Sequence, residues 1–283
     1  VPFPDGYAMV VCDSGIKARK SSNARNQFNH RISCYRIGFM LIKKLFPQYR
    51  PLLHHLRDVN VRTLGVPLAW IYRILLHLPE SATLDQLKSL LPEEDLDELC
   101  SNHQPPADGK YPIRGVVLFG LAEFERAGLY ADALKEGRIE DIGTLMKYSH
   151  DGDRVSALND DLERLPFHAP DSNSYILSLI ESLESGEPER VIKAQLQYQP
   201  GSYHCSLPEI DSMVDIACSV PGVAGAQLAG AGLGGCMMVL TKTESIEALK
   251  ETLIANYYIP VGREPQILVC RPVAGSGLMK FTP

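Results

Sequence analysis

The residue pattern most able to do chemistry is a glycine-rich segment at 225–236, which reads GAQLAGAGLGGC. Five glycines fall within eleven residues of an otherwise apolar run. Glycine permits positive φ and lets the backbone approach a ligand without a Cβ in the way, and such loops can direct N–H groups at an anion. The alternative, a tight turn between two core strands, stays open on composition alone. The segment is neither GxGxxG opening a helix nor a Walker loop, because no Gly-Lys-Ser/Thr follows.

The last quarter of the chain must position this segment. Short apolar runs on both sides predict strands at 224–229 and 236–241, followed by an amphipathic helix over 244–257 and a third strand over 266–271. This strand-turn-strand-helix-strand order indicates an antiparallel sheet with helices packed on one face, and therefore an α+β fold.

The rest of the chain reads mostly as helices. A buried strand is predicted at Tyr7 to Ser14, then a long helix from about Ser22 to Phe46, and mixed, loop-like sequence at 48–66. Thr83 to Gln86 fits a capping box at the start of a short helix. Helices over 113–136, with Gly137 as C-cap, and over 138–149 form a predicted hairpin, and residues 150–172 read as irregular.

Composition excludes some classes of protein. The chain has 283 residues and a net charge of −6, which offers no global basic surface for nucleic acid. No apolar run reaches the ~20 residues needed to span a bilayer, and no signal peptide is found. The seven cysteines are scattered and never form CxxC, so we expect buried free thiols in a reducing compartment. We expect a cytoplasmic protein with no nucleic-acid, membrane or metal site, and His150-Asp151 is interpreted as the end of a helix.

The glycine segment resembles the third conserved motif of the GHMP kinases, which in galactokinases reads close to G-[AS]-[RK]-[ML]-T-G-[GA]-G-F-G-G-C. The spacing matches without gaps through the closing Cys236, with Gln227 in place of a basic residue and Ala229 in place of threonine. The resemblance implies a loop beside the nucleotide phosphates and the sugar. It assigns this role to Gly230, Ala231, Gly232, Gly234 and Gly235.

Other stretches resemble galactokinases in the family's order. Residues 134–150 are similar to its "AL-x-x-GD…GxLMxxSH" helix pair, residues 203–214 to "Y-x-V-S-x-PELDxLV", and residues 257–272 to its final helix and strand. At the other end, VVCDSGIK resembles the strand that follows the catalytic region, in a form closer to plant arabinokinase-like sequences. Phe28-Asn29-His30-Arg31 stands in place of a Tyr-x-x-Arg near the sugar. The resemblance implies sugar-side roles for Asp13, Phe28 and Arg31.

The family's other motifs are not found in the sequence. These are the PxxGLSSSAA-type phosphate loop, an aspartate used as base, and an early Arg/Glu/Asp set for the sugar. In the family they precede the strand matched here, so the catalytic residues are expected upstream of Val1. The resemblance divides the chain into the end of an N-terminal lobe (1–47), a helical insertion and linker (48–112) and a GHMP kinase C-terminal lobe (113–283). A basic cluster between Lys17 and Arg25 reads as a solvated face or as a loop facing phosphate or sugar.

The implied function of the whole protein is transfer of the γ-phosphoryl of ATP, with Mg²⁺, to the anomeric hydroxyl of galactose or a related sugar such as arabinose. The N-terminal lobe would come from the same polypeptide or from a separate chain, and the isolated 283-residue chain is expected to be inactive. One alternative is a non-catalytic, galactokinase-like sugar-binding or regulatory protein. Another is a small-ligand domain with a ferredoxin-like end, if the loop resemblance is accidental.

Overall fold

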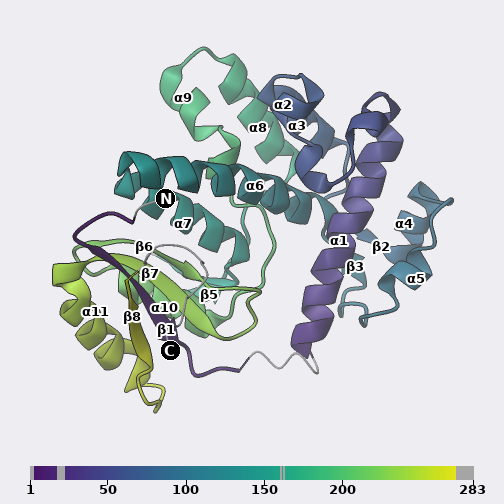
Figure 1. The fold of residues 1–283 in the computed structure, drawn as a ribbon. Coiled ribbons are helices and arrows are strands. Elements are labelled where there is room, and N and C mark those ends of the chain that lie inside the picture. The colour runs from purple at the N-terminus through teal and green to yellow at the C-terminus, as the bar shows by residue number, and fades with distance from the viewer. Residues whose placement is uncertain (1–2, 18–22, 160, 162, 272–283) are drawn as a thin grey trace, which may run out of the picture.

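The computed structural model describes residues 3–17, 23–159, 161 and 163–271. Its sheet and the helices packed on it form one part of the molecule, and a group of helices around two long ones forms the rest (Figure 1). The predicted α+β class is confirmed. The part of the basic cluster that falls in residues 18–22 lies outside the described residues.

The principal sheet has four antiparallel strands in the order β6-β7-β1-β8. They span Val223–Leu228 (β6), Cys236–Lys242 (β7), Tyr7–Asp13 (β1) and Ile267–Cys270 (β8). The strand nearest the start of the sequence is therefore an inner strand, paired along its length with β7, and its last residue, Asp13, pairs with Cys236. Alternate residues of β1 are fully buried, because successive side chains of a strand point to opposite faces of the sheet and one face carries the larger core.

Helices cover both faces of this sheet. On one face, α10 (Pro208–Cys218) and α11 (Ile246–Leu253), with the π-helical turn Ile254–Tyr258, bury a core against β1 and β7. On the other face, α7 (Ile139–Asp153) packs on β6 and contributes Ile142 and Met146 to a smaller cluster. The expectation of helices on one face alone was therefore wrong. The long apolar side of α7 buries the second face.

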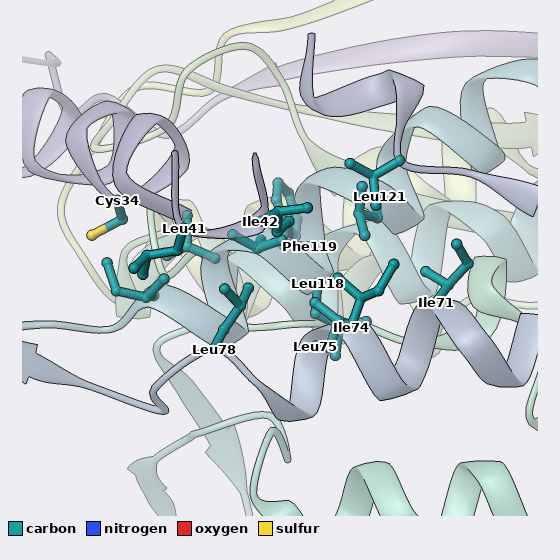
Figure 2. Close-up of a cluster of buried hydrophobic side chains, with 14 of the residues drawn as sticks. Cys34, Leu41, Ile42, Ile71, Ile74, Leu75, Leu78, Leu118, Phe119 and Leu121 are labelled. Carbon is teal, nitrogen blue, oxygen red and sulfur yellow. The ribbon is translucent and has the colours of Figure 1, made fainter. Parts of the chain in front are cut away.

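The helical part is built on α1 (Asn23–Leu45) and α6 (Ile113–Glu136), which pack on each other. Helix α3 (Leu68–Leu76) packs on α8 (Asn173–Glu184) and against α6. Figure 2 shows some of the buried side chains of this largest core. The labelled ones come from α1, α3, α6 and the segment after α3; they are Cys34, Leu41, Ile42, Ile71, Ile74, Leu75, Leu78, Leu118, Phe119 and Leu121.

Shorter elements connect these parts. They are the 3-10 turns Pro47–Leu52, Leu56–Asp58, Leu196–Tyr198 and Thr243–Ser245, the helices α2 (Val61–Leu64), α4 (Leu84–Leu90), α5 (Leu96–Cys100) and α9 (Pro188–Lys193), and the strand pairs β2–β3 (Ala82–Thr83, Lys110–Tyr111) and β4–β5 (Ser156–Leu158, Arg164–Pro166).

Several local predictions are confirmed, and one needs correction. The Thr83 and Gln86 side chains form the expected capping box at α4, and Gly137 ends α6 with a φ of 67°. The segment 150–172 is less irregular than expected, because α7 continues to Asp153 and the β4–β5 hairpin follows. Among the described helices, none is long and apolar enough to cross a bilayer. The three-part division of the chain stays a prediction.

Candidate functional site

The glycine-rich loop joins β6 to β7 and is held against the end of β1. The backbone N–H and the Oγ of Ser14 both donate to the Gly235 carbonyl, at 2.9 and 2.7 Å. In return, the Gly235 N–H donates to the Ile16 carbonyl at 2.8 Å. These bonds place the Asp13–Ile16 turn beside the loop, although more than 200 residues separate the two along the chain.

The loop is also pressed against the segment 203–205. The Leu233 N–H donates to the Cys205 carbonyl at 2.6 Å, and Leu233 itself has a left-handed φ of 61°. Gly232 has a φ of +76°, and a Cβ built on it would lie only 1.9 Å from the Cys205 carbonyl oxygen. A side chain at Gly232 is therefore excluded by both space and backbone conformation.

Not every amide of the loop is available to a ligand. The N–H groups of Ala229, Leu233 and Gly235 donate to backbone carbonyls. The other loop amides make no hydrogen bond within the part of the chain that the structure describes; they belong to Gly230, Ala231, Gly232 and Gly234. Gly230 and Ala231 lie at the surface. A loop of this kind offers several adjacent N–H donors to an anion, whereas Gly235, one of the five predicted residues, uses its amide internally.

Asp13 lies at this site in a well-held turn. Its carboxylate accepts the Gly15 N–H at 2.6 Å and lies 3.8 Å from the Cys236 sulfur. Burial, together with the Asp13 carboxylate, raises the pKa of the Cys236 thiol. The hydroxyl of Tyr258 donates to the Asp13 carbonyl at 2.7 Å. The Tyr257 hydroxyl and the Arg263 guanidinium both donate to the Ser14 carbonyl.

The two other predicted sugar-side residues lie on α1. The Nε of Arg31 donates to the Tyr203 carbonyl at 2.5 Å, and Gln27 donates to the His204 carbonyl at 2.6 Å. Phe28 is half-buried on the same helix. Arg31 therefore reaches the glycine loop only indirectly, through the segment 203–205, while Asp13 contacts it through the neighbouring turn.

This bridging segment was not singled out in the sequence as part of the site. His204 has a positive φ of 53°, which is uncommon for a residue other than glycine and is found most often at constrained sites. The N–H groups of Tyr203 and His204 both donate to the Gly152 carbonyl. The segment begins the stretch that resembles the galactokinase "PELD" motif, and that resemblance was the available signal.

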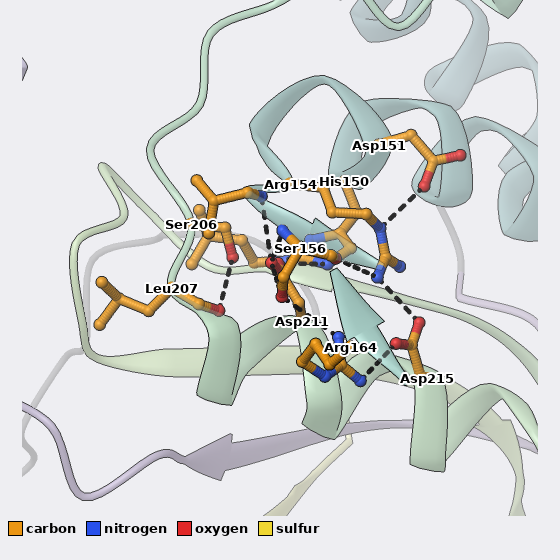
Figure 3. A network of polar contacts seen from close by, with 11 residues as sticks. His150, Asp151, Arg154, Ser156, Arg164, Ser206, Leu207, Asp211 and Asp215 are labelled. Atoms are coloured by element: carbon orange, nitrogen blue, oxygen red, sulfur yellow. Dashed lines mark hydrogen bonds and ion pairs between the residues drawn. The ribbon is translucent and has the colours of Figure 1, made fainter. Parts of the chain in front are cut away.

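Behind the loop lies a buried polar network, drawn in Figure 3. His150 Nε2 lies 3.3 Å from Asp211 Oδ1, without the alignment of a hydrogen bond. Asp211 Oδ2 accepts the N–H of Val155 and the N–H and Oγ–H of Ser156 at 2.8–3.0 Å. Nδ1 of His150 accepts the Leu228 N–H at 3.3 Å, at the end of β6. The network thus fixes the strand from which the glycine loop starts.

The environment of Asp211 favours its ionised form. Burial alone would raise its pKa, but contacts with His150 and Ser206 and the Val155 N–H lower it overall. His150 is engaged by protein groups and lies in the last turn of α7, which ends three residues later than expected, at Asp153. Within the described ranges, no group of three or more His, Cys, Asp or Glu side chains is placed to hold a metal ion. The loop amides that make no hydrogen bond among the described residues are donors of the kind that an anion accepts.

Comparison with known proteins connects this site to a family. Residues 179–259, which include α10, the glycine loop and α11, match the family described as GHMP kinases C terminal. The galactokinase of Roseiflexus sp. (strain RS-1) is 27% identical over 98% of this chain and 48% of its own length. The galactokinase of Chloroflexus aggregans is 27% identical over 97% of this chain and 47% of its own.

Among solved structures, Lactococcus lactis galactokinase complexed with galactose matches with a TM-score of 0.47 and 16% identity, over 95% of this chain and 46% of that one. The chain thus spans about half the length of the relatives that it matches. The chain carries a GHMP kinase C-terminal domain, and over nearly all of its length it is a homologue of galactokinases.

Proposed function

We propose that this chain is the C-terminal part of a sugar 1-kinase, which transfers the γ-phosphoryl of ATP to galactose or a related sugar such as arabinose. Phosphoryl transfer depends mainly on positioning and on stabilising negative charge. In this proposal the glycine loop presents its amides to the phosphates of ATP, and Asp13, Phe28 and Arg31 lie on the sugar side. The base and the Mg²⁺ ligands come from a complementary N-terminal lobe, in the same polypeptide or a separate chain.

One observation carries the proposal: hydrogen bonds hold the loop on two sides, yet four of its amides make no hydrogen bond to any residue that the structure describes. Hydrogen bonds through Leu233 and Gly235 fix it on two sides, and Gly232 is packed so closely that only glycine fits. The amides of Gly230 and Ala231 lie at the surface. Donors that are held in place before the ligand arrives cost little reorganisation when charge develops on a phosphate oxygen.

A second candidate function has support at Ala229 and Phe28. Both stand where galactokinases carry hydroxyl groups, in a threonine and a tyrosine, and neither can donate a hydrogen bond from its side chain. These replacements favour a non-catalytic, galactokinase-like protein that binds a sugar or regulates a partner.

A chimeric protein can distinguish the kinase function from the non-catalytic function. The chain is joined to the region of Roseiflexus galactokinase that it does not match, and ATP-dependent phosphorylation of galactose and arabinose is measured. The kinase proposal expects product, and expects Ala229→Thr to raise kcat by about tenfold, the effect of one added hydrogen bond to a charged group. Thermal unfolding confirms that both versions fold. Sugar binding without phosphorylation, by the parent and by Ala229→Thr alike, would instead support the regulatory protein.

A further inference from the structure

A hollow of about 490 Å³ lies where the C-terminal end of α1 meets the turn between α4 and α5. Figure 1 shows α4 and α5 on the side of α1 that faces away from the sheet. The basic residues Lys43, Lys44 and Arg50 line the hollow on the side of α1 and the turn after it. The acidic residues Glu93 and Glu94 line the opposite side. The rest of the lining is apolar and consists of Phe39, Met40, Pro47 and Leu91.

The separation of charge extends along the surface outside the hollow. Residues 43–62 contain five Lys or Arg side chains and a single acid, Asp58. The Asp58 carboxylate already accepts the N–H groups of His54 and His55, at 2.8 and 2.6 Å. Residues 93–98 contain five Asp or Glu side chains, all exposed, and no Lys or Arg. A positive surface and a negative surface therefore meet at the hollow.

The opposite charges at the hollow are only partly paired within the chain. Lys44 Nζ lies 3.0 Å from Glu93 Oε2, and this ion pair joins the two sides at one point. Arg50 and Glu94 are exposed on opposite sides of the hollow. Neither of these two side chains makes an ion pair or a hydrogen bond with a residue that the structure describes. Each can therefore take a partner from another molecule without giving up an internal contact.

Apolar surface accompanies these charges. Phe39 and Met40 are half-buried in the lining. Leu45, Leu52 and Leu90 are each 45% exposed, and each lies within two residues of a lining residue. A protein interface combines apolar contact with a polar rim, and this surface offers both. The acidic side argues against nucleic acid as the partner, because phosphates are bound by Lys and Arg.

A surface with a positive and a negative side is complementary to a second copy of itself. A two-fold axis through the hollow brings the positive side of one copy onto the negative side of the other, and it repeats the contact in reverse. We propose that two copies of this chain associate through residues 43–52 and 90–98, with Arg50 of each copy facing Glu94 of the other. No residue of the glycine loop lines the hollow. The proposal goes beyond the kinase function and does not depend on it.

Sedimentation equilibrium of the 283-residue chain at pH 7 measures this association. We expect a monomer–dimer equilibrium with a Kd of about 10 μM, at the weak end for protein interfaces. Raising the salt concentration from ~0.1 M to ~1 M shortens the screening length from about 10 Å to about 3 Å, and should weaken the dimer about tenfold. Amide hydrogen exchange should be slower in 43–52 and 90–98 in concentrated than in dilute protein, and unchanged in 229–235.

Charge reversals at the two exposed residues test the pairing itself. Arg50→Glu and Glu94→Arg should each weaken the dimer by about tenfold or more, because each variant places like charges opposite each other at two symmetry-related positions. The double variant Arg50→Glu/Glu94→Arg restores both pairs and should recover the dimer. Glu189→Arg, an exposed charge reversal on α9, should leave the Kd unchanged.

Three results would overturn the proposal. The first is a chain that stays monomeric at ~100 μM, about ten times the expected Kd. The second is a dimer that both single variants form as well as the parent does, since the copies would then associate through another surface. The third is a folded double variant that associates no better than the single ones. Each of these results leaves the kinase proposal intact.

Discussion

His150 Nε2 and Asp211 Oδ1 face each other at 3.3 Å in the interior, and they join α7 to α10 behind the glycine loop. His150 is 1% exposed and Asp211 is fully buried. Since the imidazole also accepts the Leu228 N–H, the pair connects two helices to the strand that enters the loop. The two residues come from the stretches that resemble the galactokinase "SH" and "PELD" motifs, so the structure gives these motifs a shared structural role.

Removing the Asp211 carboxyl should destabilise the fold strongly. Asp211→Ala leaves the N–H groups of Val155 and Ser156 unsatisfied and removes the carboxylate that faces the buried His150 ring, at a cost of about 3 kcal/mol or more. Asp211→Asn, which keeps the shape and one acceptor, should cost less. Urea unfolding at pH 7 measures both, with Asp132→Asn as an exposed control. Equal stability of Asp211→Ala and the parent would contradict the role given to this carboxyl.

Lowering the pH should remove the stability that the ionised Asp211 carboxylate provides. The folded-state pKa of Asp211 is lowered, so the stability it provides is present above its ordinary pKa of 3.8 and is lost as pH falls below that value. The unfolding free energy of Asp211→Asn should therefore decline less between pH 5 and pH 3 (roughly, from the linkage) than that of the parent. Parallel declines would show that Asp211 titrates alike in the folded and unfolded chain.

Asp153 should make the stability of the fold depend on pH in the opposite direction. Burial, then Glu123, raises its pKa to about 8, Asp211 adds to this, and Arg126 and the Cys205 backbone oppose it. Its Oδ1 is buried without a hydrogen-bond partner among the described residues. The folded chain thus binds a proton that the unfolded chain releases above pH 3.8, and stability falls as pH rises toward 8.

The neutral substitution Asp153→Asn should remove this dependence. It should stabilise the fold by about 1 kcal/mol or more at pH 8, where the parent must either hold a proton or bury a charge, and change stability little near pH 4. Guanidinium unfolding at the two pH values measures the difference. A stability gain of the same size at both pH values would mean that packing of the amide, rather than titration of the carboxyl, stabilises the variant.

Two glycines of the loop offer a matched pair of variants. Gly232→Ala would drive a methyl group into the Cys205 carbonyl, whereas Gly230→Ala, with a similar φ of +81°, meets nothing within 4 Å. Gly230→Ala should cost about 1 kcal/mol from backbone strain alone, and Gly232→Ala should cost more because the loop must move away from the segment 203–205. Thermal unfolding gives the costs, and exchange of the Leu233 amide reports the displacement. Equal effects of the two would contradict the close packing at Gly232.

Local signals in the sequence predicted much of the fold. The capping residues Thr83 and Gln86, the C-cap Gly137 and the strands on both sides of the glycine loop depend on neighbours in the chain, and all are found in the structure. The sequence did not show that Tyr7–Asp13 would become an inner strand between β7 and β8. That pairing joins segments more than 200 residues apart, and no local pattern encodes it.

The candidate site could be predicted only in part from the sequence. The glycine loop has a readable spacing, and Asp13 is found beside it. The link from Arg31 to the loop through Tyr203 and Cys205 was not predictable, because it runs through backbone carbonyls that any residue type would supply. A cavity beside the N-terminal half of α1 could not be foreseen either, because its lining comes from five separate parts of the chain: 26–31, Ser81, 104–112, 168–171 and 202–204.

The central claim is that the chain supplies the phosphate loop of a sugar kinase and needs a complementary lobe for the chemistry. The most direct measurement is transfer of labelled γ-phosphate from ATP to galactose or arabinose, by the purified 283-residue chain alone and after joining it to the unmatched region of Roseiflexus galactokinase. We predict no sugar phosphate from the chain alone and product from the joined protein. Sugar phosphate formed by the chain alone, or none formed by a folded joined protein, would contradict the claim.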